Sequence, residues 1–236
     1  MLEIKDYTKV YPNGKVGAKD VCITVEDGDI FAFIGHNGAG KTTTIKSVVG
    51  INDITKGDIL IDGVSVKSNP IEAKKLIAYV PDNPDLYQNL TGIEYLKFIA
   101  EIFAVSQKDF DELVEKYAKA LELYSNLNSP ISTYSHGMCQ KLAVISALIH
   151  NPRVLILDEP FVGLDPKASF ILKETMREFV KNGGAIFFST HVLEVAEKLC
   201  NKVAIIKNGE VIKQGTMEEV KKDKSLEAVF LESSNE

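Results

Sequence analysis

The sequence Gly35-His36-Asn37-Gly38-Ala39-Gly40-Lys41-Thr42-Thr43 decides the fold of this chain. It fits the phosphate-binding pattern G-x-x-x-x-G-K-[ST], in which glycines let backbone N–H groups close around phosphate oxygens. The apolar run at residues 30–34 predicts a buried strand before this loop, and residues 43–49 predict a short helix after it. This order of strand, loop and helix argues against a chance glycine-rich turn. Lys41 is expected to reach the β- and γ-phosphates of a nucleotide, and the Thr42 hydroxyl to bind Mg²⁺.

The composition is that of a soluble globular protein. The chain has 236 residues, 45% hydrophobic and 25% charged, which fits one large domain or one domain with an inserted subdomain. Its net charge of −6 argues against non-specific nucleic-acid binding, which needs a basic surface. Cys22, Cys139 and Cys200 are too dispersed for a disulfide framework or zinc site, so a reducing cytosol is favoured. No apolar run reaches the roughly 18 residues of a membrane span, so at a membrane the protein is expected to work from outside the bilayer.

Turn signals predict three β-hairpins. The first is formed by residues 2–10 and 16–25, the second by residues 58–66, and the last turns at Asn208-Gly209. Unbroken apolar runs at residues 77–80, 154–157 and 185–190 predict further strands, of the kind found at the centre of parallel sheets. The expected fold class is α/β: a P-loop core with a mostly parallel sheet, an antiparallel β-subdomain and an inserted α-helical subdomain.

The helical subdomain is expected at residues 85–150. Thr91 with Glu94 forms a capping box, and Ser106 with Asp109 caps a second helix. Apolar residues at helical spacing are expected to line one face of each helix, namely Tyr95, Phe98, Ile99 and Ile102 in the first and Leu113, Val114, Tyr117 and Leu121 in the second. Residues 1–236 are then a single domain, with an α/β core formed by residues 1–84 and 151–236.

Three further expectations concern the C-terminal third. Proline at the first turn and glycine past the end predict a helix from Pro166 to Asn182. A second, amphipathic helix follows residue 191, with Val192, Val195, Ala196 and Leu199 facing inward. Residues 232–236 are expected to fray.

An acidic pair follows the apolar strand at residues 154–157. At the carboxyl end of a strand in a P-loop protein, Asp158 can bind Mg²⁺, and Glu159 can orient and deprotonate the attacking water. The alternative, two acids that cap a turn, is weakened by the P-loop. His191 follows the strand at residues 185–190 and can hydrogen-bond a γ-phosphate, although a histidine at a strand end is more often structural.

The order of these motifs resembles that of the nucleotide-binding subunits of ATP-binding cassette (ABC) transporters, over nearly the whole chain. Residues 35–43 resemble the Walker A motif, residues 154–159 Walker B, and residues 163–166 (Gly-Leu-Asp-Pro) the D-loop. The resemblance implies ATP and Mg²⁺ as cofactors, with adenine stacked on Tyr11. It implies two catalytic residues, Glu159 and the switch histidine His191, and three residues at the metal, Thr42, Asp82 and Asp158.

The segment Tyr134-Ser135-His136-Gly137-Met138 stands where the family has its signature, usually Leu-Ser-Gly-Gly-Gln. In the family, this serine and the backbone after it bind the γ-phosphate held by the opposite subunit. The resemblance therefore implies Ser135 and Gly137 as nucleotide-binding residues in an ATP-dependent dimer, expected to be a homodimer. Two departures stand out: His136 and Met138 replace a glycine and a glutamine, and Asp82 replaces the glutamine of the Q-loop.

These departures, with the closing run at residues 225–230, resemble the ABC-2-type branch of drug and peptide exporters. The branch implies a separate integral-membrane permease, export, and a place at the cytoplasmic face of a bacterial-type cell membrane, with no nucleic-acid partner. One alternative is a soluble ABC ATPase acting on ribosomes or DNA, but such proteins usually have two cassettes or a long coiled-coil insertion. The other is an unrelated P-loop kinase or GTPase, which gives no reason for the Ser-x-Gly-Met segment.

Residues 86–103 carry more aromatic side chains than a small helical insertion readily buries. Most are expected in the core, and the rest are expected to line a groove. That groove would receive a short cytoplasmic helix of the permease.

Overall fold

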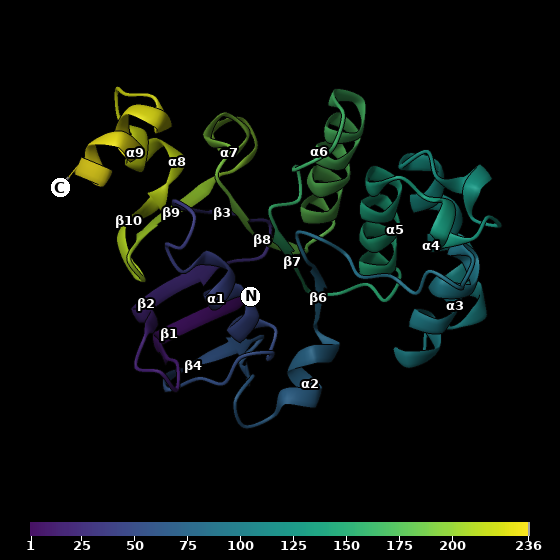
Figure 1. The fold of residues 1–236 in the computed structure, drawn as a ribbon, viewed down its shortest axis with the longest axis horizontal. Helices are drawn as coiled ribbons and strands as arrows, with labels where there is room; N and C mark the ends of the chain where they lie inside the picture. The colour runs from purple at the N-terminus through teal and green to yellow at the C-terminus, as the bar shows by residue number, and fades with distance from the viewer. Residues whose placement is uncertain (236) are drawn as a thin grey trace.

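A computed structural model describes residues 1–235. It contains two sheets, and helices cover the larger one (Figure 1). The four-stranded sheet, in the order β2-β1-β4-β5, is antiparallel. The six-stranded sheet has the order β10-β9-β3-β8-β7-β6, in which only β10 pairs antiparallel. The α/β fold class, with a mostly parallel sheet and an antiparallel one, is confirmed.

The strands follow the hydrophobic pattern closely. The antiparallel sheet consists of β1 (Leu2–Val10), β2 (Val16–Val25), β4 (Lys56–Ile61) and β5 (Val64–Ser65). The larger sheet consists of β3 (Ile30–Ile34), β6 (Ile77–Val80), β7 (Val154–Asp158), β8 (Ala185–Thr190), β9 (Lys202–Lys207) and β10 (Glu210–Thr216). All three expected hairpins are present.

Alternation along β3 separates two hydrophobic cores. Phe31 and Phe33 face the core shared with the antiparallel sheet and with α1 (Lys41–Val48). Ile30, Ala32 and Ile34 face the core on the other side of the sheet, formed with the helices. Every residue of β3 is buried, as expected for a strand that is covered on both faces.

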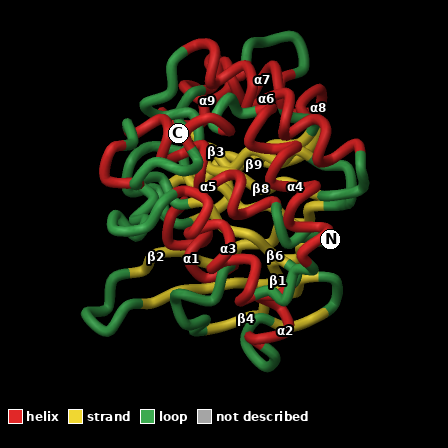
Figure 2. The backbone as a smooth tube through the Cα atoms, turned by 90° about the vertical axis from the view of Figure 1, so that its right-hand side faces the viewer, coloured by secondary structure: helices red, strands yellow, loops and turns green. Residues whose placement is uncertain are grey.

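The helices on that second side are α5 (His136–Leu148), α6 (Pro166–Lys181), α7 (Leu193–Leu199), α8 (Met217–Lys221) and α9 (Leu226–Asn235). With α5, helices α3 (Gly92–Ile102) and α4 (Gln107–Ala120) form a helical unit at one end of the molecule (Figures 1 and 2). The short α2 (Pro70–Lys75) lies beside the antiparallel sheet. Both predicted caps, Thr91 with Glu94 and Ser106 with Asp109, are present.

The structure corrects three details. In α3 the buried stripe contains Leu96 and Ala100, whereas Phe98 and Ile102 are 39% and 60% exposed; at about 100° per residue they point away from Leu96. Val192 is exposed because it precedes α7 as its N-cap. Residues 232–235, expected to fray, continue α9; Glu236 lies outside the described residues.

Candidate nucleotide-binding site

The Walker A loop connects the carboxyl end of β3 to the first turn of α1. Its backbone turns sharply at Gly40, which has φ = 112°, a left-handed conformation that favours glycine. A Cβ atom at Gly35 would lie 2.6 Å from the carbonyl oxygen of Ile206. Only glycine fits at either position, so the pattern reflects the packing of the loop as well as its room for phosphates.

Lys41 lies at the bottom of this loop and is only 6% exposed. Its Nζ donates to the carbonyl oxygens of Gly35 (2.8 Å) and His36 (3.4 Å). The same Nζ lies 3.5 Å from Oε1 of Glu159. The ammonium group is therefore held between its own loop and the acidic end of β7.

Asp158, 4% exposed, ends β7 opposite Ser189 in the parallel register. The hydroxyl groups of Ser189 and Thr42 donate to Oδ1 of Asp158 over 2.5 Å and 3.4 Å. Within residues 1–235, no group of three or more His, Cys, Asp or Glu side chains is placed to hold a metal ion alone. The Thr42–Asp158 pair nevertheless fits Mg²⁺, which is usually bound by one or two carboxylates together with phosphate oxygens and water.

Glu159 is held by its neighbours in an uncommon backbone conformation, with φ = 49°. Its N–H group donates to the backbone oxygen (3.2 Å) and Oγ (3.0 Å) of Ser189. Its Oε2 lies 2.9 Å from Nδ1 of His191 and accepts the His191 N–H over 3.2 Å. The two oxygens of its carboxylate thus contact Lys41 on one side and His191 on the other.

Lys41, Asp158 and Glu159 line one cavity of about 610 Å³, whereas His191, Gly35 and Ala39 are not among its lining residues. Most of the expected site residues line it, namely Tyr11, His36, Asn37, Gly38, Gly40, Lys41, Thr42, Thr43, Asp82, Asp158 and Glu159. The Tyr11 hydroxyl lies 3.1 Å from Oγ1 of Thr43, and the Tyr11 ring forms part of the wall.

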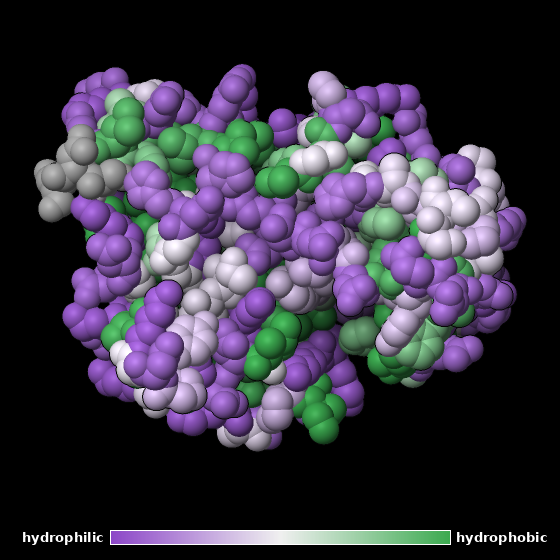
Figure 3. All heavy atoms as spheres, in the orientation of Figure 1, coloured by the Kyte–Doolittle hydropathy of each residue, from purple (hydrophilic) through white to green (hydrophobic). Residues whose placement is uncertain are grey.

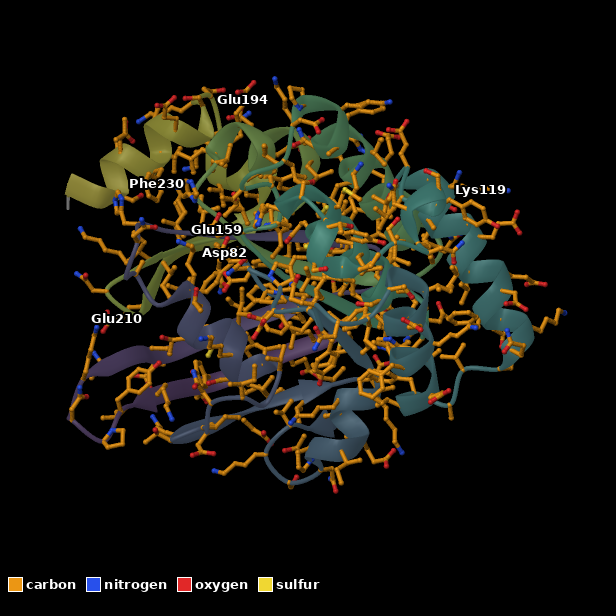
Figure 4. The ribbon with its side chains drawn as sticks, turned by 45° about the vertical axis from the view of Figure 1, so that its right-hand side comes forward. Asp82, Lys119, Glu159, Glu194, Glu210 and Phe230 are labelled. Carbon is orange, nitrogen blue, oxygen red and sulfur yellow. The ribbon has the colours of Figure 1, made fainter. Side chains whose placement is uncertain are left out.

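Asp82 is exposed in the loop after β6 and lies close to Glu159 at the cavity (Figure 4). Burial, together with the nearby charges of Asp158 and Asp82, raises the pKa of the neighbouring Tyr79 to about 12. Asp82 and Asp158 both line the cavity.

The cavity also contains residues that the sequence did not single out. Asn13, Lys15, Val16 and Gly17 line it from the β1–β2 hairpin. In the sequence, these residues are marked only by their position shortly after Tyr11, in the turn and at the start of the next strand. Ser189 hydrogen-bonds Asp158 from the neighbouring strand. The sequence does not show this contact, because it depends on the pairing of β7 with β8.

Ser135 and Gly137 are not among the residues that line this cavity. Ser135 is the N-cap of α5, and its Oγ accepts the N–H of Met138 over 3.3 Å. The His136 ring lies against the D-loop: a Cβ atom at Gly163, which has φ = 75°, would come within 2.8 Å of it. The signature segment and the D-loop therefore contact each other, at a place apart from the cavity.

Residues 18–162 match the family model described as ABC transporter. The chain belongs to the ABC transporter family. It is 35% identical to the ABC-type transporter ATP-binding protein EcsA of Bacillus subtilis, over the whole of this chain and 97% of that protein. It is 30% identical to the ABC transporter ATP-binding protein NatA of the same organism, over 98% of this chain and 97% of that one.

Among solved structures, the chain is similar to an ATP-binding subunit of an ABC transporter, with a TM-score of 0.95, 34% identity and 99% of both chains covered. It is also similar to CbiO1 of Clostridium perfringens, part of the transporter complex CbiONQ, with a TM-score of 0.81, 26% identity, and 93% of this chain and 89% of that one covered. The chain is thus an ATP-binding subunit of an ABC transporter and an ATPase of that family, which excludes an unrelated kinase or GTPase.

Proposed function

We propose that this ABC subunit hydrolyses ATP to drive export through a separate integral-membrane permease, at the cytoplasmic face of a bacterial-type cell membrane. The observation that supports hydrolysis is the position of Glu159, which lines the cavity with Lys41 and whose carboxylate contacts both Lys41 and His191. A carboxylate held beside a phosphate-binding lysine can deprotonate a water aimed at the terminal phosphate.

The main residues of the site then have defined tasks. Lys41 and the loop N–H groups bind the β- and γ-phosphates, while Tyr11 stacks on adenine. His191, fixed by Glu159, contacts the γ-phosphate. Thr42, Asp158 and Asp82 would hold Mg²⁺, which supplies charge neutralisation at the phosphate oxygens.

The separation of Ser135 and Gly137 from the cavity supports a dimer. Because Ser135 starts α5, the first N–H groups of that helix can bind an anion. Because these residues do not line the cavity of their own subunit, we propose that the nucleotide that they contact belongs to a second copy. The proposed assembly is a head-to-tail homodimer with two ATP molecules between the subunits.

An apolar groove on the helical unit supports the proposal of a permease partner. It has a volume of about 450 Å³ and is lined by Leu86, Tyr87, Gln88, Asn89, Leu90 and Phe98. Tyr87 is 59% exposed, and its ring centroid lies 5.6 Å from that of Phe98 and 6.2 Å from that of Tyr95. Figure 3 shows apolar side chains gathered on the lower part of this unit, over α3. A groove of this kind suits a short amphipathic helix.

No helix among residues 1–235 is long and apolar enough to cross a membrane.

The test is Tyr87→Glu, with co-purification from solubilised membranes as the measurement. The charge should abolish recovery of the polytopic membrane protein that accompanies the wild-type chain, and leave ATP binding by the isolated subunit intact. Tyr124→Glu is the matched control, since Tyr124 is 50% exposed but lies outside the groove. Permease binding that survives glutamate at every exposed position from 86 to 103 would place the contact elsewhere. Co-sedimentation with ribosomes or DNA would favour the soluble alternative.

A further inference from the structure

The Walker A loop lies against the C-terminal part of the chain in three places. The Gly35 backbone packs on the carbonyl of Ile206 at the end of β9. The N–H group of Gly209, in the β9–β10 turn, donates to the Ala39 oxygen over 2.8 Å. The third contact is between side chains: the rings of His36 and Phe230 have centroids 4.6 Å apart at an angle of 53°.

Phe230 is held in place by the packing and hydrogen bonds of α9. It belongs to α9, together with the buried Leu226 and Val229, and is itself only 9% exposed. The start of α9 is fixed because the Leu226 N–H donates to Oε2 of Glu197 in α7 over 3.0 Å. Near its end, Nζ of Lys207 donates to the Ser233 oxygen over 3.4 Å. In Figure 4, Phe230 lies on the side of α9 that faces Glu159.

The His36 ring therefore connects α9 to the phosphate-binding backbone. His36 lines the nucleotide cavity. Its carbonyl oxygen accepts the Ala39 N–H over 3.1 Å and the Lys41 ammonium over 3.4 Å. A shift of the His36 ring would move the part of the loop that holds this lysine.

We infer that Phe230 is a positioning residue: it holds the His36 end of the Walker A loop in the shape that binds nucleotide, so that nucleotide affinity depends on the packing of α9. This inference rests on the proposed nucleotide site. Aromatic pairs of this geometry stabilise by an amount that corresponds to about a threefold to tenfold change in a dissociation constant.

The experiment uses the full chain with Phe230→Ala, Phe230→Leu and Phe230→Tyr, and measures ATP binding by calorimetry and steady-state ATPase kinetics. Alanine and leucine should raise the Kd and KM for ATP about threefold to tenfold, whereas tyrosine, which keeps the ring, should stay within about twofold of wild type. At saturating ATP the kcat of all three should stay near the wild-type value, since Phe230 does not touch the reacting groups. A merely structural role would lower the melting temperature of Phe230→Leu without raising its Kd for ATP.

Two neighbours in α9 serve as matched controls. Leu231 is 54% exposed, so Leu231→Ala should change neither binding nor melting temperature. Val229 is 3% exposed, so Val229→Ala should lower the melting temperature and leave the Kd unchanged. If Val229→Ala weakens ATP binding as much as Phe230→Ala does, the stability of the helix controls affinity and the assignment to the ring is wrong.

The possible results distinguish a failure of the role of Phe230 from a failure of the proposed nucleotide site. Wild-type protein that binds ATP, together with Phe230→Ala and Phe230→Leu variants of the same affinity, would overturn the role of Phe230 alone. Wild-type protein that binds no ATP, or binds it as well after Lys41→Ala, would overturn the site and the inference with it.

Discussion

Nζ of Lys41 lies 3.5 Å from Oε1 of Glu159, and both side chains are largely buried at the nucleotide cavity. A buried lysine needs a partner of opposite charge, because an isolated buried charge is strongly unfavourable. In this structure the partner is the residue proposed as catalytic base. Under the proposed function, phosphate oxygens would replace Glu159 as the partner of Lys41 and leave the carboxylate to act on water, so nucleotide binding and activation of the base would be coupled.

The first prediction is that Lys41→Ala reduces ATP hydrolysis to background, because the cation that faces the β- and γ-phosphates is lost. Phosphate release at saturating ATP measures this. Lys46→Ala is the control, since Lys46 lies on the exposed side of the same helix α1 and should leave the rate unchanged. Undiminished turnover in Lys41→Ala would show that the phosphates bind elsewhere.

The second prediction is that Glu159→Gln hydrolyses ATP at least about 100-fold more slowly than wild type, because the amide keeps the shape of the side chain but cannot accept the proton. ATP should remain bound, and the protein should elute as a dimer in gel filtration with ATP. Glu174→Gln, on the exposed side of α6, should behave as wild type. Normal hydrolysis by Glu159→Gln would show that another residue deprotonates the attacking water. A variant that stays monomeric with ATP would argue against a dimer of the isolated subunit.

The parts of the site that the sequence predicts well are those made by consecutive residues. The Walker A loop, the acidic end of β7 and the helix caps at Thr91 and Ser106 each depend on chemistry within a few residues. The sequence could not show Ser189 behind Asp158, or Phe230 beside His36, because these contacts depend on strand register and on the packing of distant segments. It also grouped Phe98 and Ile102 with Tyr95 and Ile99 on one face of the helix, because apolar spacing alone does not say which side of a helix meets the core.

The third prediction concerns Asp82, which stands where the family has a glutamine. Asp82→Asn should raise the Mg²⁺ concentration needed for half-maximal ATPase activity at least about threefold, because it removes a negative charge from an oxygen-rich cation site. Asp82→Gln should behave similarly, since it keeps an oxygen donor without the charge. Asp85→Asn, in the same loop but outside the cavity, is the control. A Mg²⁺ dependence that is the same in all four proteins would remove Asp82 from the metal site.

The last prediction concerns stability and pH at the edge of the helical unit. The ring of His150 is stacked on Phe103, with centroids 3.8 Å apart, and its Nε2 lies 3.1 Å from the Ile77 oxygen. Burial lowers the pKa of His150 from its ordinary value of 6.5. The unfolded chain therefore binds a proton at this residue at a higher pH than the folded chain does. The stability contributed by the neutral ring is fully present above pH 6.5 and is lost as the pH falls toward the folded-state pKa.

We expect the free energy of unfolding of the wild-type protein to fall between pH 7 and pH 5, with His150 contributing at most about 1.4 kcal/mol per pH unit. His150→Gln should show a smaller slope over the same range, since it removes the titrating group. Phe103→Leu, which uncovers the ring, should reduce the slope in part, because the pKa of His150 then returns toward its ordinary value. Urea unfolding at each pH measures the three slopes. Parallel profiles for wild type and His150→Gln would mean that other groups cause the acid sensitivity, and that the buried ring does not carry it.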